Sequence, residues 1–364
     1  MRALSFIPCA LFAGLSATAC AAPAAPVASP PVEHLPAEGL ALVGGTVVGT
    51  GVATVTVQGD SITALGPPPD GVERVNLAGH WIVPSVIDAH VHLAYYPAAD
   101  GLRDGGVAGA VDWAAPVGSL GDPPIVLRTA GPILTAQGGY PTQSWGANGY
   151  GLEIPNVDAA AAAVATVADA GATVVKIAVG AGGPELSDET LTRICDEAHA
   201  RGMLVGAHAL RDGDARRAAA VGADILVHAP IESLSADVVQ AWSTKAVIPT
   251  VSAFSGTAST RQLAEAGATV LYGTDFGNTR ALGVSAPELE GMVDAGLDGA
   301  AILRAATAAP AETFGLERLG AIAVGKEASL LVLDADPLVD PLALARPAAV
   351  LHRGELVAGA LPGR

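Results

Sequence analysis

The sequence predicts an α/β protein in which a (β/α)8 TIM barrel carries a small β-sandwich formed by both chain ends. Two observations support this prediction. Between residues 84 and 317, apolar strands alternate with helical stretches, a rhythm typical of βα units around a parallel sheet. Residues 39–83 and 318–364 instead contain short strands divided by Gly and Asp turns, which predicts a composite sandwich beside the barrel.

Eight strand candidates in the central region match the number that closes a (β/α)8 barrel, a fold of roughly 250 residues. They are Ile82–Leu93, Val107–Ala114, Ile125–Ala130, Thr173–Val179, Met203–Ala209, Asp224–Ala229, Val247–Ala253 and Thr269–Asp275. Four of them follow a helical stretch that ends in glycine, which commonly stops a helix in the left-handed conformation. The four glycines are Gly171, Gly202, Gly222 and Gly267.

The first residues predict an export signal. Arg2 precedes an apolar run, Ala3–Ala19, that is too short for a stable spanning helix and ends in small residues before Cys20. We expect residues 1–20 to be a lipoprotein signal peptide and Cys20 to be lipidated, with ordinary cleavage nearby as the alternative. Residues 21–38, rich in Ala and Pro, predict a flexible tether. The expected location is the periplasm or cell envelope, with Cys20 as the only membrane anchor.

Composition restricts the partners. The chain has 19 Lys and Arg against 36 Asp and Glu, a net charge of −17, which argues against nucleic acid and anionic membranes as electrostatic partners. We expect a small-molecule substrate, and a homo-oligomer is compatible with the sequence. With Cys9 and Cys20 in the signal, Cys195 is the one cysteine of the folded body, so no internal disulfide is expected and Cys195 reads as a buried small hydrophobe.

Side chains that bind metals end five of the predicted barrel strands. The first strand carries His90 and His92, and because alternate residues of a strand point to the same side, both imidazoles face one way. Active sites of such barrels lie at the C-terminal face, where the strand ends converge. This set favours a transition metal, with Zn²⁺ expected and Mn, Fe or Co also compatible. The full set is His90, His92, Lys176, His208, His228 and Asp275.

Each of these side chains also has a structural alternative. His90 and His92 carry the strongest signal, with two hydrogen-bonded core histidines as the alternative. Asp275 would otherwise cap a turn. Lys176 would otherwise extend to solvent at the barrel rim, whereas inside the barrel its charge would be costly and its pKa lowered. The remaining histidines read as surface or filler residues: His34, His80, His199 and His352.

Together these motifs resemble the amidohydrolase superfamily and, within it, the imidazolonepropionase-like and prolidase-like branch. The resemblance extends from about Gly39 to the C-terminus. It rests on the Asp-Ala-His-Val-His motif at residues 88–92, on the lysine and histidines that end the central strands, and on the Gly-Thr-Asp motif at residues 273–275. Three later segments, beginning at Pro287, Ala305 and Gly320, also fit, the last resembling the family's return into its β-sandwich.

The resemblance implies a binuclear site with two divalent ions. His90 and His92 would bind the more buried ion together with Asp275. His208 and His228 would bind the second ion. A water between the two ions would become the hydroxide nucleophile, and the second ion would polarise the scissile carbonyl or phosphoryl oxygen.

The resemblance also implies roles for two side chains, Lys176 and Asp275. Lys176, carboxylated on its amine, would bridge the two ions, which converts a buried cation into an anionic oxygen ligand. Asp275 would accept the proton of the bridging water and pass it to the leaving group. Tyr140 is a candidate substrate or oxyanion contact, with a packed loop aromatic as the alternative.

The expected function is hydrolysis of a C–N bond in an amide, a cyclic amide or a dipeptide-like substrate. Lactone, ester or organophosphate hydrolysis stays open, because the same binuclear site serves all of them. A non-catalytic metal-binding or solute-binding lipoprotein is a further alternative, against which the complete ligand set argues. Deamination is disfavoured, since those relatives usually hold one metal and lack the bridging lysine.

Overall fold

The computed structural model describes residues 39–119 and 121–362. The predicted signal peptide at 1–20, its lipidation site Cys20 and the tether at 21–38 lie outside these residues. Within the described ranges, no helix combines the length and the apolar character that a membrane crossing requires.

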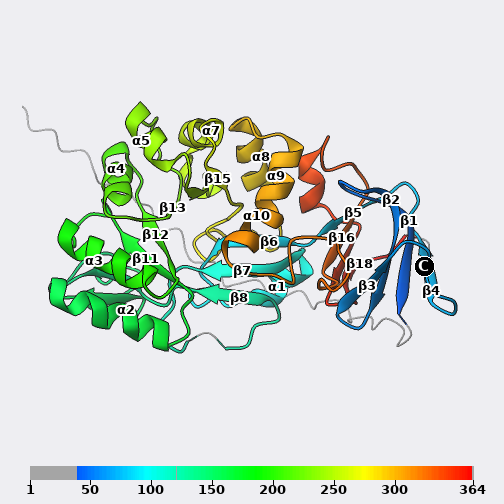
Figure 1. Cartoon of the computed structure of the whole chain (residues 1–364), viewed down its shortest axis with the longest axis horizontal. Coiled ribbons are helices and arrows are strands. Elements are labelled where there is room, and N and C mark those ends of the chain that lie inside the picture. Colours follow the sequence, from blue (N-terminus) through cyan, green and yellow to red (C-terminus); the bar gives the residue numbers. More distant parts are fainter. Residues whose placement is uncertain (1–38, 120, 363–364) are drawn as a thin grey trace, which may run out of the picture.

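Both ends of the chain share one sheet of mixed strand directions, at the right of Figure 1. Its strands are β1 (Leu40–Val47), β2 (Gly51–Gln58), β3 (Ser61–Leu65), β4 (Glu73–Asn76), β5 (Trp81–Pro84), β16 (Leu330–Leu333), β17 (Ala349–His352) and β18 (Glu355–Gly359). β1 pairs antiparallel with β2 and parallel with β4 and β5, and β5 pairs antiparallel with β16. The predicted association of the two chain ends is confirmed, while their arrangement as a sandwich remains a prediction.

The central region is built from parallel strands. They are β6 (Val86–Val91), β7 (Val107–Asp112), β8 (Val126–Thr129), β9 (Ile133–Ala136), β10 (Gly151–Ile154), β11 (Val174–Ala178), β12 (Leu204–His208), β13 (Ile225–Val227), β14 (Ala246–Ile248) and β15 (Thr269–Val270). β6 to β8 form one sheet, and the others form a second sheet in the order β10-β9-β11-β12-β13-β14-β15. All of these pairings are parallel, as the βα rhythm predicts.

Backbone hydrogen bonds link the two parallel sheets at both edges. The Thr173 N–H donates to the Thr129 carbonyl at 2.9 Å, which joins the start of β11 to the end of β8. On the other side, the Ala89 N–H donates to the Tyr272 carbonyl at 2.8 Å and the His92 N–H donates to the Phe276 carbonyl at 2.6 Å. The segment that follows β15 therefore lies beside β6, so strands far apart in the chain become neighbours.

Helices follow the strands and lie on their outer side (Figure 1). They are α1 (Ala99–Asp104), η1 (Val157–Ala159), α2 (Ala160–Asp169), α3 (Asp188–His199), α4 (Asp212–Ala220), α5 (Ala236–Trp242), α6 (Val251–Phe254), α7 (Thr257–Glu265), α8 (Ala286–Asp294), α9 (Gly299–Ala306), α10 (Ala308–Thr313) and η2 (Pro341–Ala345). The four glycines predicted to stop helices have φ between +71° and +101°, the left-handed conformation expected of such stops.

The interior of the barrel is packed with small and branched side chains around the indole of Trp113. Its cluster draws Ile87 from β6 and Ile248 from β14, from opposite ends of the barrel sequence. The Trp113 Nε1–H donates to the Ala89 carbonyl at 2.6 Å. A Cβ at Gly206 would overlap the Trp113 ring, so glycine at this point of β12 leaves the room that the indole needs.

The observed strands are mostly shorter than predicted, and three candidates differ most. The candidate Thr269–Asp275 is a strand only over β15, Thr269–Val270. The candidate Ile82–Leu93 is divided, because the chain leaves the end sheet at Pro84 and enters the barrel as β6. The candidate Val247–Ala253 ends at Ile248, and α6 begins at Val251. Proline at position 249 has no N–H for a strand ladder, and Thr250 has a left-handed φ of 47°, so the chain turns there.

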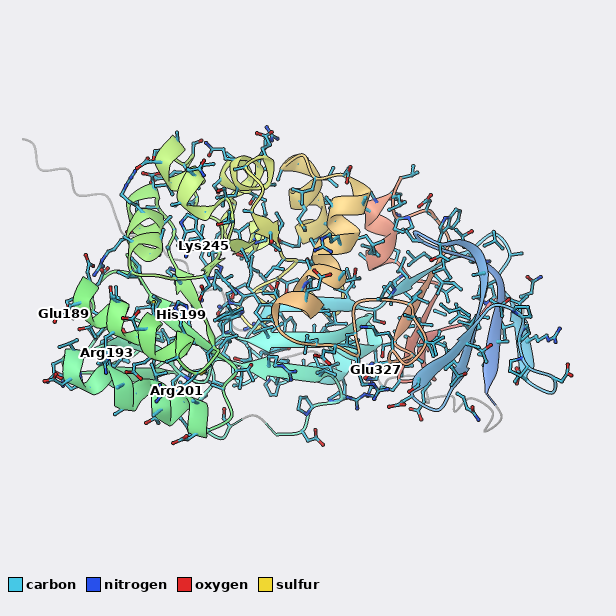
Figure 2. The ribbon with its side chains drawn as sticks, in the orientation of Figure 1. Glu189, Arg193, His199, Arg201, Lys245 and Glu327 are labelled. Atoms are coloured by element: carbon cyan, nitrogen blue, oxygen red, sulfur yellow. The ribbon has the colours of Figure 1, made fainter. Side chains whose placement is uncertain are left out.

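Of the histidines read as surface or filler residues, His34 lies outside the described residues and His80 is 3.3 Å from the Asp334 carboxylate. His199 is exposed on α3, 2.8 Å from the Asp224 carboxylate (Figure 2). His352 is buried, and its Nε2 is 2.8 Å from the Pro124 carbonyl, which anchors the loop before β8. Cys195 is buried in α3, and burial raises the pKa of its thiol to about 12, so it is the inert hydrophobe that the sequence predicts.

Candidate metal centre

Strand β6 presents two buried imidazoles to the same point. His90 and His92 are separated by one residue, so their side chains leave the strand on the same side. Their Nε2 atoms are 3.2 Å apart, and the two side chains are 0% and 4% exposed. Two imidazole nitrogens at this distance, sealed from water, create an electron-rich point that a cation would stabilise.

Asp275 completes this point from the segment beside β6. Its Oδ1 is 3.0 Å from the His92 Nε2 and 3.4 Å from the His90 Nε2. Asp275 has a left-handed φ of 54°, a conformation that costs energy in a residue with a Cβ and is concentrated at functional sites. The Asn278 side-chain amide lies 3.2 Å from both carboxylate oxygens and orients them.

The donor atoms of His90, His92 and Asp275 fit a metal ion. The ligand atoms all lie within 4.8 Å of one another. A tetrahedral ion with bonds of about 2.0–2.1 Å separates its ligand atoms by about 3.3 Å, and the three separations here lie between 3.0 and 3.4 Å. One carboxylate oxygen and two imidazole nitrogens are also the ligand types that zinc and related ions use in hydrolytic enzymes.

Two further imidazoles extend the centre across the barrel. His208 ends β12, and His228 directly follows β13 with a φ of 102°. The His228 ring stacks on the His90 ring with centroids 4.6 Å apart, and the His208 ring lies 5.1 Å from the His228 ring. The His228 Nδ1 is 2.8 Å from the Thr250 hydroxyl, which fixes the ring orientation and leaves Nε2 toward the centre.

Lys176 lies inside the ring of strands rather than at its rim. It is 2% exposed, in the middle of β11, with its Nζ 5.6 Å from the centroid of the Trp113 ring. Burial lowers the pKa of its amine to about 7, against a smaller opposing effect of the Asp275 carboxylate. The rim alternative for Lys176 is therefore wrong, and its amine can lose a proton near neutral pH.

Burial also keeps three of the imidazoles neutral. It holds the pKa of His90 and of His228 well below the ordinary range and lowers that of His208 to about 3. A neutral imidazole keeps a free lone pair on one nitrogen, which is the form that binds a metal. The centre is thus ready to take up cations at neutral pH without first releasing protons from these rings.

Asp88 holds the two halves of the centre in register. Its Oδ1 accepts the backbone N–H groups of His90 at 3.0 Å and Thr274 at 3.1 Å, and its Oδ2 accepts the Thr274 hydroxyl at 2.6 Å. It therefore fixes the backbone beside both His90 and Asp275. In the sequence, Asp88 is visible only as part of the motif at residues 88–92, and its role follows from the structure.

Two other buried carboxylates support the mouth and were missed from the sequence. Asp112, at the end of β7, accepts the Ala94 N–H at 3.0 Å and fixes the loop after His92; burial raises its pKa to about 6. Glu288, on α8, accepts the N–H groups of Val251 at 2.9 Å and Ser252 at 2.8 Å and so caps α6. Asp112 ends a strand, a signal that could have found it, whereas Glu288 has no local signal.

Tyr140 stands beside the second pair of imidazoles. Its ring centroid is 5.4 Å from that of His208, and its Oη accepts the Trp145 Nε1–H at 3.1 Å. Burial raises the pKa of the phenol, so it stays protonated. Because the indole uses an acceptor position of the oxygen, the phenol O–H remains available as a donor.

Residues 128–360 match the sequence model of the amidohydrolase family. The chain belongs to this family. It is a metal-dependent hydrolase of the amidohydrolase type, with a buried His-His-Asp group at its metal centre.

Solved structures agree with this assignment. A Bifidobacterium longum protein assigned as a prolidase is 27% identical, with a TM-score of 0.74 over 89% of this chain and 96% of that one. A Xaa-Pro dipeptidase with bound methionine is 20% identical (TM-score 0.74; 87% and 99% covered), and phenylurea hydrolase B is 19% identical (TM-score 0.70; 88% and 96% covered). The last two likenesses show the fold alone. No curated protein matches the chain.

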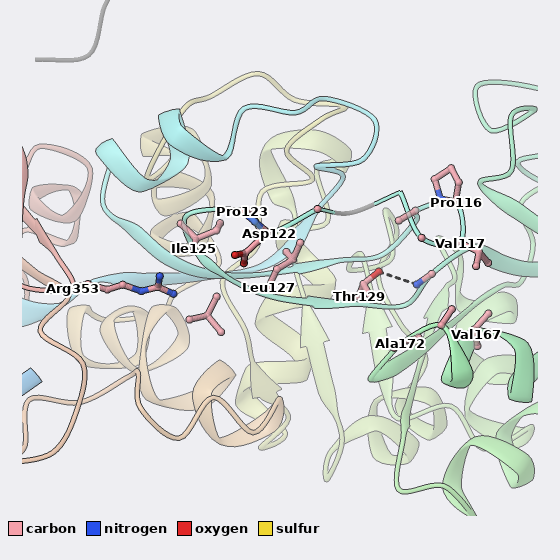
Figure 3. A pocket seen from close by; sticks show the side chains of 17 residues that line it. Pro116, Val117, Asp122, Pro123, Ile125, Leu127, Thr129, Val167, Ala172 and Arg353 are labelled. Atoms are coloured by element: carbon pink, nitrogen blue, oxygen red, sulfur yellow. Dashed lines mark hydrogen bonds between the residues drawn. The ribbon is translucent and has the colours of Figure 1, made fainter. Parts of the chain in front are cut away.

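A separate cavity of about 380 Å³ lies away from this amidohydrolase centre (Figure 3). It is lined by the loop before β8, by β8 itself, by α2 and by Arg353 from the end sheet. No residue of the metal centre lines it, so its shape has no bearing on the chemistry.

Replacing His92 by alanine is expected to weaken metal binding by at least about 100-fold, because one of three convergent ligand atoms is lost. The metal content of the protein after dialysis against buffered zinc, measured by inductively coupled plasma mass spectrometry, tests this loss of binding. His199→Ala removes an exposed imidazole and should leave the metal content unchanged. Equal metal loss in both variants would contradict the assignment of the centre.

Glu288 predicts a pH dependence of stability in the metal-free protein. Burial raises its pKa from 4.5 to about 7 in the folded state. Folding thus favours the protonated acid, so this stabilising contribution is complete below pH 4.5 and is lost as the pH rises to about 7. In urea unfolding of the wild type, Glu288 should lower the free energy of unfolding by about 3 kcal/mol at alkaline pH relative to acidic pH. Glu288→Gln should lack that component, and an unchanged pH profile would refute it.

Proposed function

We propose that this amidohydrolase hydrolyses the C–N bond of an amide, a cyclic amide or a dipeptide-like substrate at the mouth of a closed eight-stranded barrel. The convergence of the His90, His92 and Asp275 donor atoms, with His208, His228 and Lys176 around them, carries the proposal. The edge-to-edge hydrogen bonds of the two parallel sheets support closure of the barrel.

The residues fit two divalent ions, with zinc expected. His90, His92 and Asp275 would hold one ion, and His208 and His228 the other. Bound ions of this kind supply an acidified water and polarise a carbonyl oxygen. Asp275, with both oxygens oriented by Asn278, would serve as the proton acceptor at this site and as the proton donor to the leaving nitrogen.

Lys176 is proposed to carry a carboxyl group on its amine and to join the two ions. The neutral amine attacks CO₂, the new N–C bond forms and one amine proton is released, which leaves a carbamate anion. The lowered pKa of Lys176, about 7, supports this step because the neutral amine is present near neutral pH. Charge also supports it, since an anion replaces a cation that would face the bound ions.

Substrate contacts are proposed from the loops. Tyr140, with its free O–H directed from beside His208, is placed to donate to a substrate oxygen. The prolidase-type protein named above, at 27% identity, favours C–N bonds over esters and phosphotriesters. Export and lipidation at Cys20 are proposed from residues 1–38. Assembly into a homo-oligomer and the absence of nucleic-acid partners are also proposals, the latter from the net charge of −17.

A screen of the metal-loaded protein tests the activity. We expect turnover on N-acyl amino acids or dipeptides, with Asp275→Asn lowering kcat by roughly 10²–10⁴-fold and leaving the fold intact, because general acid–base catalysis contributes on this scale. Asp294→Asn, an exposed change of the same kind, is the control. Turnover only on lactones, esters or phosphotriesters would replace the proposed bond type, and tight metal binding without turnover on any class would favour a binding protein.

Lys176→Ala is expected to lose most activity and to regain part of it when short carboxylic acids such as acetate are added. The added acid would supply the oxygen ligands that the carbamate normally provides. Initial rates with and without acetate measure the rescue, with Lys245→Ala as the lysine control. Absence of rescue, together with no carbamate signal in the ¹³C NMR spectrum of the folded protein equilibrated with ¹³CO₂, would argue for a single ion.

A further inference from the structure

Aromatic side chains are scarce in this chain but gather beside the metal centre. The sequence contains five Tyr, five Phe and four Trp in 364 residues. Four of the five tyrosines belong to ring contacts next to the metal ligands, together with one tryptophan: Tyr95, Tyr96, Tyr140, Trp145 and Tyr150. The buried core uses mainly Ala, Val, Leu and Ile. This placement therefore is not the general packing habit of the protein.

Trp145 is the centre of the group. Its ring centroid is 5.5 Å from that of the metal ligand His92, 5.4 Å from that of Tyr95 and 5.5 Å from that of Tyr150. The Tyr95 and Tyr150 rings are 6.0 Å apart. We call Tyr95, Trp145 and Tyr150 the aromatic wall. The wall adjoins the metal ligands, because Trp145 contacts His92 and Tyr95 follows His92 by three residues.

Hydrogen bonds hold the wall in place before any ligand arrives. The Tyr95 N–H donates to the His92 carbonyl at 3.2 Å, so the wall starts in a turn directly after the ligand. The Tyr150 hydroxyl donates to the Ala94 carbonyl at 3.0 Å, which ties the loop after β9 to the loop after β6. The Ala94 N–H is in turn held by Asp112 at 3.0 Å. Rings fixed in this way lose little freedom when a ligand binds.

The wall is not buried in the core. Tyr95 is 39% exposed, and Trp145 and Tyr150 are both of intermediate exposure. Aromatic faces left open to water next to a catalytic centre gain free energy by covering apolar substrate surface. The wall offers no charged group, and its tyrosine hydroxyls lie at ring edges. It therefore suits a flat or bulky apolar group better than a charged one.

We propose that the aromatic wall is a subsite for an aromatic or large apolar side chain next to the scissile bond, so that the substrates are N-acyl or dipeptide amides of such amino acids. The inference rests on the proposed C–N hydrolysis for its catalytic meaning. The binding preference does not depend on catalysis, because it requires only that the side chain of the ligand contact the aromatic wall.

Equilibrium binding to the full-length, metal-loaded protein carrying Asp275→Asn, in which most turnover is expected to be lost, provides the test. N-acetyl-L-phenylalanine and N-acetylglycine are titrated calorimetrically, since they share an acetyl group and a carboxylate and differ in the side chain. We expect the phenylalanine ligand to bind the protein with an unaltered wall about tenfold or more tighter, and Trp145→Ala in the same background to remove most of that ratio. Metal content is measured in parallel, because Trp145 touches His92.

Matched variants separate the wall from its surroundings. Tyr96 is exposed to the same 39% as Tyr95, but its ring contacts Phe276 and Arg280 instead of Trp145. Tyr96→Ala should therefore keep the ligand ratio, whereas Tyr95→Ala should lower it and gives the same information if Trp145→Ala fails to fold. Trp145→Phe retains a ring and should keep most of the ratio.

The outcomes also separate this inference from the proposed function. A preserved ratio in both Trp145→Ala and Tyr95→Ala, or no preference in the protein with an unaltered wall, overturns the subsite even if the protein hydrolyses amides. A ratio that depends on the wall in a protein whose wild type shows no turnover upholds the subsite and refutes the hydrolase. Where turnover is found, the ratio of kcat/KM for phenylalanyl and glycyl amides should follow the binding ratio across the variants.

Discussion

The carboxylate of Asp88 is the contact on which the metal centre depends. His90 lies on β6, the first strand of the central region, and Asp275 follows β15, the last one. Asp88 joins these two segments by its hydrogen bond to Thr274, 186 residues away in the sequence. It accepts three hydrogen bonds, from both strand ends, in a place with no access to water. A buried acceptor with all its donors present is rigid, because breaking any one bond leaves a polar group unsatisfied. The separation of the three ligand atoms follows from this rigidity.

Burial supplies the electrostatics of the site. In a polar environment His90, His208 and His228 would carry protons part of the time and Lys176 would be a full cation. Removed from water, these three imidazoles lose their protons and the amine approaches neutrality. The same burial favours the binding of a cation, since the Asp275 carboxylate is held by the neutral Asn278 amide and lies beside two imidazoles.

The mouth combines support and recognition in the same loops. Asp112 and Glu288 place the loops after β7 and β14 by accepting backbone N–H groups, so they act through the backbone rather than on a substrate. The loops after β6 and β9 carry the aromatic rings. The core also contains large rings such as Trp113 and Trp242, but the rings of these two loops stay partly open to water, where they can contact a ligand.

The sequence by itself determined the order of the barrel strands, the glycine stops and the identity of the residues that end the strands. These are local properties, since a strand end can be read from hydrophobic runs and helix stops within a few residues. Tertiary structure alone decided which strand ends touch, how Pro249 turns the seventh strand into α6, and that Lys176 lies inside the ring. It also placed Trp145 against His92 and Asp88 against Thr274. Such contacts join residues far apart in sequence, and their distances follow from the closing of the strands into a ring, which no single segment encodes.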